Sequence, residues 1–309
     1  MSATATQIPI SEASVAGESE WPDASGPAIE TIIQPSRGWL AVPWAEMARQ
    51  RELLFFLVWR DIKVRYKQAV LGIAWVVLQP VINVVIFTAI FGAGLNLASR
   101  LGSSVNIPYP VYVFAALLPW QLISRSLNDG GMSLVNQQHL LTKIYFPRLF
   151  VPSAAVGSAM FDMLISMPIL FAVLVIYKVP FTLNLLALLP LTALTLILGL
   201  GIAYVLSALT VTYRDFRFLI GFMSQIWMWT SFIMIPVPDN WHTKWYYKLW
   251  LGSNPLYGIV SGFRRALLPS MDKGWDPWNL LYATGISLAL FTIGIFYFRR
   301  TERRFADIA

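Results

Sequence analysis

The sequence has 309 residues, of which 57% are apolar and 13% charged, and its mean hydropathy is +0.60. Soluble domains have about 45–50% apolar and about 25% charged residues, so this composition excludes a simple cytosolic enzyme and indicates a protein surrounded by lipid. The net charge is +7, and it is unevenly distributed. The absence of cysteine excludes a disulfide framework, an iron–sulfur cluster and thiol catalysis.

Residues 1–36 carry five acidic residues and no basic one, which leaves +12 for the rest of the chain. This segment lacks the basic start and apolar stretch of a secretory signal. Its polar composition predicts a disordered cytoplasmic tail, with docking on a partner as the alternative. We expect a single membrane domain over residues 37–309.

Residues 44–67 have the pattern of an amphipathic helix that lies in the membrane interface. The same residues suit a stop signal that orients the following span, and both roles are compatible. The apolar face is expected to contain Phe55, Val58, Trp59, Ile62 and Tyr66. The bases expected to meet lipid headgroups are Arg60, Lys63, Arg65 and Lys67.

Six long stretches with almost no charge can each cross a hydrocarbon core, which takes roughly 20 apolar residues. They predict an all-α integral membrane protein with six transmembrane helices. Residues 249–263 are uncharged but too short to span, which predicts a re-entrant hairpin between the fifth and sixth spans. The spans are expected at about 69–94, 110–127, 149–177, 185–209, 218–238 and 278–298.

The basic residues predict the orientation of these spans, because Lys and Arg are enriched in short cytoplasmic segments. With the N-terminus inside, 16 of the 23 bases fall on inner segments and seven on outer ones. The sequence therefore predicts that both termini are cytoplasmic.

Several kinds of chemistry have no motif in the chain. His139 and His242 fall on opposite predicted sides of the membrane, so they cannot assemble a metal site. No G-x-x-x-x-G-K-[ST] loop and no G-x-S-x-G elbow is present. Asp162 is the one acid within a span, where a functional role is the default hypothesis. Hydrogen bonding to a neighbouring helix, from a face shared with Ser158 and Ser166, is the alternative.

Two inner segments, residues 136–152 and 212–218, combine aromatic and charged residues as protein-docking surfaces do. The alternative for residues 136–152 is an ordinary interfacial belt, and the alternative for residues 212–218 is a charged turn that sets topology. The residues singled out are Lys143, Ile144, Tyr145, Phe146, Arg148, Arg214 and Asp215.

Aromatic residues make up 14% of the chain, and many tryptophans stand at span ends, where they anchor in the interface. Deeper tryptophans suit the lining of a channel for a sugar chain, because pyranose C–H faces stack on aromatic rings without a fixed hydrogen-bond register. Lipid-facing or helix-packing positions are the commoner alternative. The deeper tryptophans are Trp75, Trp120, Trp227 and Trp229.

Four stretches resemble the membrane subunit of type-2 ABC polysaccharide exporters. The longest is RELLFFLVWRDIKVRYKQAVLGIAWVVLQP at 51–80; the others are LLTKIYFPRLFVP at 140–152, YRDFRF at 213–218 and SNPLYGIVSGFRRALL at 253–268. The resemblance covers residues 31–300 and is greatest to permeases that export the O-antigen of lipopolysaccharide. Capsule and wall-teichoic-acid exporters share the same plan.

This resemblance implies a homodimer in the bacterial inner membrane, with six spans per subunit and two copies of a separately encoded ABC ATPase. ATP and Mg would bind that partner, while this chain would hold no cofactor, metal or catalytic residue. The implied substrate is a polyprenyl-diphosphate-linked polysaccharide, and no nucleic acid is involved.

The resemblance also implies roles for individual segments. Residues 44–67 correspond to an interface helix and 136–148 to a coupling helix that sits in a groove on the ATPase. Residues 249–268 correspond to re-entrant gate helices at the periplasmic end, and the implied gate residues are Asn254, Pro255, Tyr257 and Arg264. The chain departs from the pattern at Ile235-Pro236, where many relatives have Ser-Pro.

Alternative functions stay open at this point. The same fold could export capsule, teichoic acid or a small lipophilic substrate. An integral membrane glycosyltransferase would need paired carboxylates or a metal motif near one face, whereas Asp162 and Asp215 each stand alone in the sequence. A purely structural anchor would need neither interrupted spans nor a re-entrant hairpin.

Overall fold

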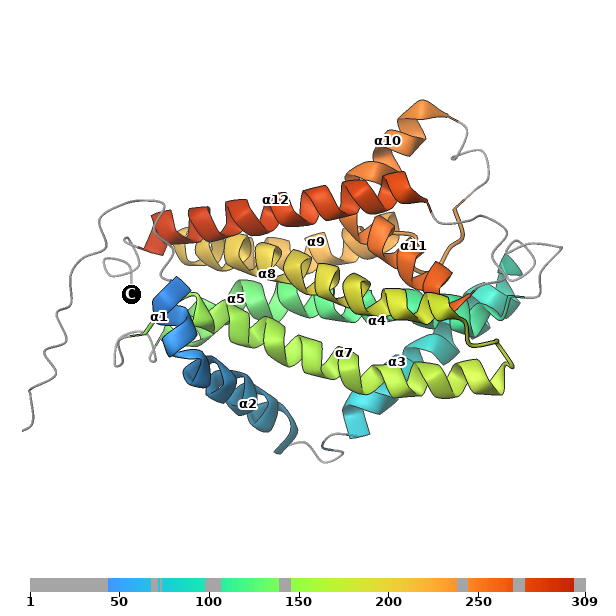
Figure 1. The fold of residues 1–309 in the computed structure, drawn as a ribbon, viewed down its shortest axis with the longest axis horizontal. Coiled ribbons are helices and arrows are strands. Elements are labelled where there is room, and N and C mark those ends of the chain that lie inside the picture. Colours follow the sequence, from blue (N-terminus) through green and yellow to red (C-terminus); the bar gives the residue numbers. More distant parts are fainter. Residues whose placement is uncertain are drawn as a thin grey trace, which may run out of the picture. The chain divides into compact units, whose positions relative to one another are not determined.

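The computed structural model describes residues 44–67, 72, 74–97, 107–138, 146–237, 244–268 and 276–302, all within the unit Gly38–Ala309. The described residues form helices and no strand (Figure 1). The predicted tail at 1–36 lies outside them.

The helices are α1 (Trp44–Arg49), α2 (Arg51–Lys67), α3 (Ala74–Phe87), the π-helix η1 (Thr88–Gly94), α4 (Tyr109–Arg125), the π-helix η3 (Ser126–Gly130), α5 (Gly131–Asn136), α7 (Phe150–Ile176), the 3-10 helix η4 (Leu183–Ala187), α8 (Leu188–Thr212), α9 (Phe216–Thr230), α10 (Trp245–Ser253), α11 (Pro255–Leu267) and α12 (Pro277–Glu302).

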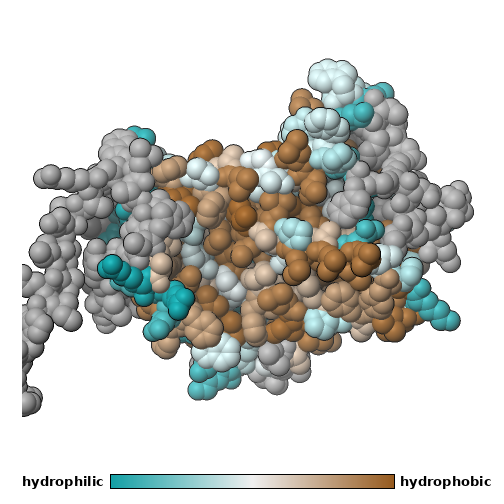
Figure 2. Space-filling view, viewed as in Figure 1, coloured by the Kyte–Doolittle hydropathy of each residue, from teal (hydrophilic) through white to brown (hydrophobic). Residues whose placement is uncertain are grey.

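Four helical stretches are long and apolar enough to cross a membrane: Ala74–Gly94, Phe150–Ile176, Leu183–Thr212 and Pro277–Glu302. They coincide with the first, third, fourth and sixth predicted spans. The second and fifth predicted spans fall on α4, with 17 residues, and α9, with 15. Figure 2 shows apolar side chains over most of the middle of one face, with hydrophilic ones gathered near its edges. The described part is thus an all-helical membrane protein.

The helix ends differ from the prediction where backbone conformation interrupts an apolar run. The expected interface helix divides at Gln50 into α1 and α2, and the first span begins only at Ala74, after Gly72 with a φ of 51°. The fifth helix ends at Thr230 rather than at 238, because Phe232 adopts a φ of 53° and the chain then reaches Pro236. The expected hairpin is a pair of short helices, α10 and α11, that meet at Asn254.

Helix α4 lies at the centre of the core, with nearly every side chain buried although it carries Pro119 in its interior. It contacts α7, α8 and α11, while α8 packs along α12. The burial shows that α4 is enclosed by the other helices.

The contact between α8 and α12 depends on two glycines. A Cβ atom added at Gly201 would lie 2.6 Å from the backbone nitrogen of Phe291, and one at Gly294 would lie 2.7 Å from the carbonyl oxygen of Gly201. Small residues allow backbones in membrane helices to approach closely. No side chain fits at these positions without moving one helix away from the other.

The helix bundle has two ends, which contain different helices (Figure 1). At one end, α2, α5, the start of α7 and the end of α12 meet in a hydrophobic cluster that includes Leu57, Leu134, Phe146, Phe150 and Phe298. At the other end, α10 and α11 lie beside the start of α12. The termini of successive long helices alternate between these two ends, as expected for a chain that repeatedly crosses a membrane.

Replacing Gly201 with Leu should separate α8 from α12 and lower the stability of the detergent-solubilised protein by at least about 2 kcal/mol, because the added atoms meet backbone. The matched control is Gly285→Leu on α12, where an added Cβ has no neighbour within 4 Å. The thermal unfolding midpoint, followed by tryptophan fluorescence, measures both. Equal midpoints for the two variants would contradict the close α8–α12 contact.

Candidate functional site

A buried ionic cluster joins α2 to the bundle, and we call it the Asp162 cluster. The Asp162 side chain on α7 is fully buried, and its Oδ2 accepts a hydrogen bond from Arg65 Nη1 at 2.6 Å. Arg125 donates to the same oxygen, and the Tyr66 hydroxyl donates to Oδ1. The second amino group of Arg65 reaches Asp129 Oδ2 at 2.8 Å. Two helices, α2 and α4, thus supply the three partners of one carboxylate on α7.

The Asp162 cluster is electrically balanced, with two guanidinium groups against two carboxylates. Burial alone would lower the pKa of Arg65, but the charges of Asp162 and Asp129 raise it above its ordinary value, so this guanidinium stays charged. Burial and the hydrogen bond to Asp162 raise the pKa of Tyr66, so its hydroxyl keeps the proton that it donates. A buried carboxylate is tolerated only when it is paired and hydrogen-bonded in this way.

Local sequence places each member of the cluster. Arg65 and Tyr66 occupy the last turn of α2, and Arg125 ends α4 just before the π-helix η3. The wider π turn carries Asp129, and π-helical turns are frequent at functional sites. The predicted face of α7 is confirmed by burial of Ser158 and Ser166 together with Asp162.

Helix α2 also packs directly on α7. Val58 faces Gly157, where an added Cβ would lie 2.8 Å from a methyl group of Val58, and Leu57 and Ile62 are buried. The residues of the expected apolar face differ in their surroundings: Val58 and Ile62 pack against the bundle, whereas Phe55 and Trp59 are 71% and 43% exposed. The apolar residues of α2 divide between a protein-facing side and an exposed side, because the helix contacts both.

The four bases expected at lipid headgroups have different surroundings. Arg65 points into the Asp162 cluster, and Arg60 is bonded to Asp61 and to Gln137 Oε1 at 2.8 Å. Lys63 and Lys67 are exposed, and the Lys63 ammonium lies 5.5 Å from the centre of the Trp59 ring. Only the two lysines keep the open position that a headgroup contact requires.

The residues expected to dock a partner protein have different surroundings in the structure. Phe146 is 7% exposed and belongs to the cluster with Leu57 and Phe298, so the expectation of an exposed aromatic there is wrong. Arg148 donates to the carbonyl oxygen of Glu302 at 3.0 Å, which joins the start of α7 to the end of α12. Arg214 and Asp215 are exposed between α8 and α9. Lys143, Ile144 and Tyr145 lie outside the described residues.

Asn254 joins the α10–α11 hairpin to α9. Its Oδ1 accepts from the backbone nitrogens of Leu256 and Tyr257 and, at 2.8 Å, from Trp227 Nε1. Its amide nitrogen donates to the Thr230 carbonyl and to the Ser231 hydroxyl. The following Pro255 occupies the first position of α11, where the fixed φ of proline suits a helix start.

The other two gate residues lie deeper in the same region. Arg264 is 3% exposed, and its guanidinium donates to the carbonyl oxygens of Tyr112, Phe232 and Ile233 while lying 3.6 Å from the centre of the Tyr112 ring. Tyr257 is buried and meets Phe232 edge-on. These contacts hold α11 against α4 and the end of α9.

The four deeper tryptophans do not converge on one surface. Trp120 is 8% exposed within the core, and Trp227 is half-buried at the bond to Asn254. Trp75 and Trp229 are exposed on α3 and α9, and Trp229 meets Phe91 edge-on at 6.2 Å. Of these four tryptophans, only Trp75 and Trp229 are exposed on the surface of a single chain.

Sequence reasoning singled out Asp162 but missed its partners Arg65, Tyr66 and Arg125, and it missed Asp129, the second carboxylate that accepts from Arg65. Two facts could have indicated the partners: a buried carboxylate must be paired, and basic residues stand at the ends of the neighbouring helices. Among the described residues, no group of three His, Cys, Asp or Glu side chains could hold a metal ion. Both histidines lie outside the described part of the chain.

These observations define a multi-helix membrane protein in which an ionic cluster ties helix α2 to the bundle. The sequence profile of the ABC-2 type transporter family matches residues 52–268, more than half of the chain, and the chain belongs to this family. The resemblance drawn from the sequence motifs is thereby confirmed.

Similar proteins include two named O-antigen export system permease protein RfbA. The one from Myxococcus xanthus is 25% identical over 258 residues, which cover 83% of this chain and 96% of the relative. The one from Klebsiella pneumoniae is 26% identical over 264 residues, covering 83% and 95%. The polysialic acid transport protein KpsM of Escherichia coli is 24% identical over 250 residues, covering 79% and 91%.

Changing Asp162 to Asn should destabilise the protein by about 3–5 kcal/mol, because Arg65 and Arg125 lose a buried counter-charge. Asp215→Asn, an exposed carboxylate on the same side of the bundle, should change stability by less than about 0.5 kcal/mol. Denaturant unfolding in mixed micelles measures both. In a double-mutant cycle, Arg125→Gln should cost much less in the Asp162→Asn background than in the natural chain; additive effects would contradict the pairing.

Changing Asn254 to Ala removes the N-cap of α11 and leaves the Trp227 indole without its acceptor, so stability should fall by about 1–2 kcal/mol. Trp227→Phe removes the indole donor alone and should cost less. The comparison of thermal midpoints distinguishes the two contributions. A larger loss for Trp227→Phe than for Asn254→Ala would show that the capping role is secondary.

Proposed function

We propose that this chain is the membrane permease of an ATP-driven exporter that moves lipid-linked polysaccharide, with O-antigen as the substrate class, across the bacterial inner membrane. The observation that carries the proposal is membership of the ABC-2 type transporter family over residues 52–268. Relatives that cover most of this chain carry names of O-antigen and polysialic acid transport proteins. The apolar helices suit a multi-pass protein of that membrane.

In this proposal α4 and α9 complete a set of six spans, and α10 with α11 forms a re-entrant hairpin. Helix α4 is enclosed by protein, so a length of 17 residues suffices when neighbouring helices satisfy its ends. The end of the bundle that carries α1, α2 and the end of α12 faces the cytoplasm, as the distribution of bases predicts. The hairpin end then faces the periplasm.

The energy for transport comes from a separately encoded ABC ATPase, present in two copies, which binds ATP and Mg. The chain itself has no P-loop motif. We place the docking site at the cytoplasmic end, where Arg214 and Asp215 are exposed between α8 and α9. The predicted coupling helix at 136–148 connects α5 to α7 in the sequence.

The Asp162 cluster suits the transmission of movement from this end to the spans. Helix α2 is bonded to α7 and α4 through Asp162, and it packs on α7 through Val58 and Gly157. Closely packed elements joined by buried ion pairs move together rather than deform. A displacement of α2 or of the start of α7 therefore moves both helices. ATP shifts the equilibrium only if the ATPase binds the two channel states with different affinity.

A homodimer supplies the channel. Helices α3 and α9 have few buried residues in the single chain: Val76, Pro80 and Val84 in α3, and Ile220 and Ser224 in α9. The π-helix η1, which continues α3, meets α9 through the edge-on contact between Phe91 and Trp229. We place the second copy across these helices, so that Trp75 and Trp229 lie near the passage between the subunits.

A second substrate class, an acidic capsular polysaccharide, is favoured by the similarity to the polysialic acid transport protein KpsM. The glycosyltransferase alternative loses support, because Asp129 and Asp162 are brought together only as hydrogen-bond acceptors of Arg65. Asp162 is fully buried, so it is not open for acid–base chemistry with a sugar.

Reversing charge at the proposed docking turn should disrupt the complex with the ATPase. We expect the Arg214→Glu, Arg217→Glu variant to lose most of the co-purifying ATPase, by about tenfold or more, and to lose export to the same degree. Lys244→Glu, an exposed base at the opposite end, should retain both. Quantitative mass spectrometry of tagged protein from native membranes measures the ATPase, and surface polysaccharide on gels measures export.

Absence of any ABC ATPase from the natural complex, with the chain correctly folded, would overturn the proposed function. An ATPase bound equally well by both variants would overturn the location of the docking turn alone.

A further inference from the structure

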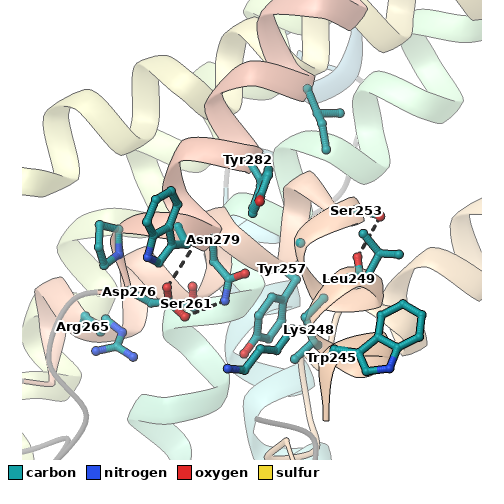
Figure 3. Close-up of a pocket in the computed structure, with 15 residues that line it drawn as sticks. Trp245, Lys248, Leu249, Ser253, Tyr257, Ser261, Arg265, Asp276, Asn279 and Tyr282 are labelled. Carbon is teal, nitrogen blue, oxygen red and sulfur yellow. Dashed lines mark hydrogen bonds between the residues drawn. The ribbon is translucent and has the colours of Figure 1, made fainter. Parts of the chain in front are cut away.

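A pocket of about 790 Å³ opens between α10, α11 and the first turns of α12 (Figure 3). It lies at the hairpin end of the bundle, whereas the Asp162 cluster and the proposed docking turn belong to other helices. Volumes of this size are typical of sites for small molecules. The lining side chains used below are Lys248, Arg265, Asp276, Trp278, Tyr282 and Ile286.

The charged side chains of the pocket lining leave one positive charge unbalanced. Figure 3 shows Arg265 of α11 beside Asp276, and the negative charge of this carboxylate stabilises the guanidinium. Asp276 also caps α12, because it accepts from the Asn279 backbone nitrogen and, at 2.7 Å, from the Asn279 amide nitrogen. Lys248 of α10 is exposed and has no carboxylate partner among the described residues. The lining therefore carries one net positive charge, which is located at Lys248.

The pocket becomes apolar along α12, one of the helices long enough to cross a membrane. Trp278, Tyr282 and Ile286 recur at intervals of four residues, so they form one stripe on this helix. The first two are 67% and 53% exposed, and Trp and Tyr are enriched at the level of lipid headgroups. Eight residues of α-helix rise about 12 Å, which is most of the roughly 15 Å of one leaflet. The stripe therefore runs from headgroup depth to acyl-chain depth.

We infer that this pocket binds one anionic phospholipid of the surrounding membrane, with the phosphodiester at Lys248 and an acyl chain along Tyr282 and Ile286. An ammonium group and a phosphate oxygen form a charge-assisted hydrogen bond. The single unbalanced positive charge matches the single negative charge of a phosphodiester. Trp278, near the start of the apolar stripe, packs beside the glycerol part of the lipid.

This inference goes beyond the proposed function, because the bound lipid stays in place and is not exported. It touches α10, α11 and α12 at once, so it holds the hairpin against the last membrane-spanning helix. In the orientation proposed above, the lipid belongs to the periplasmic leaflet. Its binding requires neither an ATPase nor a glycan.

Other lipid heads fit the charges of the lining less well. A zwitterionic phospholipid would add a second ammonium group close to Lys248. The carboxylate that could receive this ammonium, that of Asp276, is already engaged by Arg265 and Asn279. A head with two negative charges would need a second unbalanced base, which the described lining lacks.

Titration of the purified, delipidated chain with phosphatidylglycerol tests the inference, with bound lipid counted by native mass spectrometry. Phosphatidylethanolamine with the same acyl chains is the zwitterionic probe. We expect about fivefold tighter binding of phosphatidylglycerol to the natural chain, and Lys248→Gln should abolish this preference. The matched control is Lys244→Gln, which should keep the preference, because Lys244 lies one turn earlier, outside the pocket lining, with its ammonium 5.8 Å from the centre of the Tyr246 ring.

Trp278→Ala is a second variant, which leaves the charges of the pocket in place. It should weaken the binding of both lipids by about threefold and retain the preference for phosphatidylglycerol. Elution as a single species with an unchanged unfolding midpoint shows that each variant is folded.

Two results would overturn the site. One is equal binding of the two lipids by the natural chain, and the other is a preference that Lys248→Gln leaves intact. Loss of the preference to the same degree in Lys244→Gln and Lys248→Gln would replace the pocket with a diffuse attraction between α10 and anionic lipid. Because no ATPase takes part, none of these results bears on the proposed exporter.

Discussion

Burial of the Asp162 carboxylate imposes the constraint on which the position of α2 depends. An ionised group away from water is stable only with counter-charge and donors around it. Arg125 reaches it from α4, but the remaining donors, Arg65 and Tyr66, come from α2. Helix α2 is therefore fastened to the bundle, and its position becomes a property of the core.

The two ends of the bundle hold chemically different sites. At one end, charges are neutralised within the protein, and a few exposed charged side chains such as Arg214 remain for a partner. At the other end, Asn254 and Arg264 hold the α10–α11 hairpin through backbone carbonyls and the indole of Trp227. Between these ends, close approach at Gly201 keeps α8 and α12 in contact.

Sequence hydropathy located the four membrane-spanning helical stretches of the described residues, because apolar runs of about 20 residues have few alternative structures near a membrane. It could not give the helix ends, which depend on single backbone conformations such as that of Phe232. The cluster was predictable only to the extent that Asp162 needs partners. The choice of Arg65 over the neighbouring Lys63, and the burial of Phe146, arise from the packing of α2 and the end of α12 against α7, which sequence spacing does not encode.

The central claim is that α2 and α7 move as one unit when the transporter works. The natural chain has no cysteine, so nitroxide labels at Phe55→Cys and Leu164→Cys, both exposed positions, report the distance within one subunit by pulsed electron paramagnetic resonance when labelled chains are diluted with unlabelled ones. With the ATPase bound, addition of ATP should leave this distance distribution unchanged in the chain with an intact Asp162 and broaden it in the Asp162→Asn variant. A shift of several ångströms on ATP addition with Asp162 intact would contradict the account.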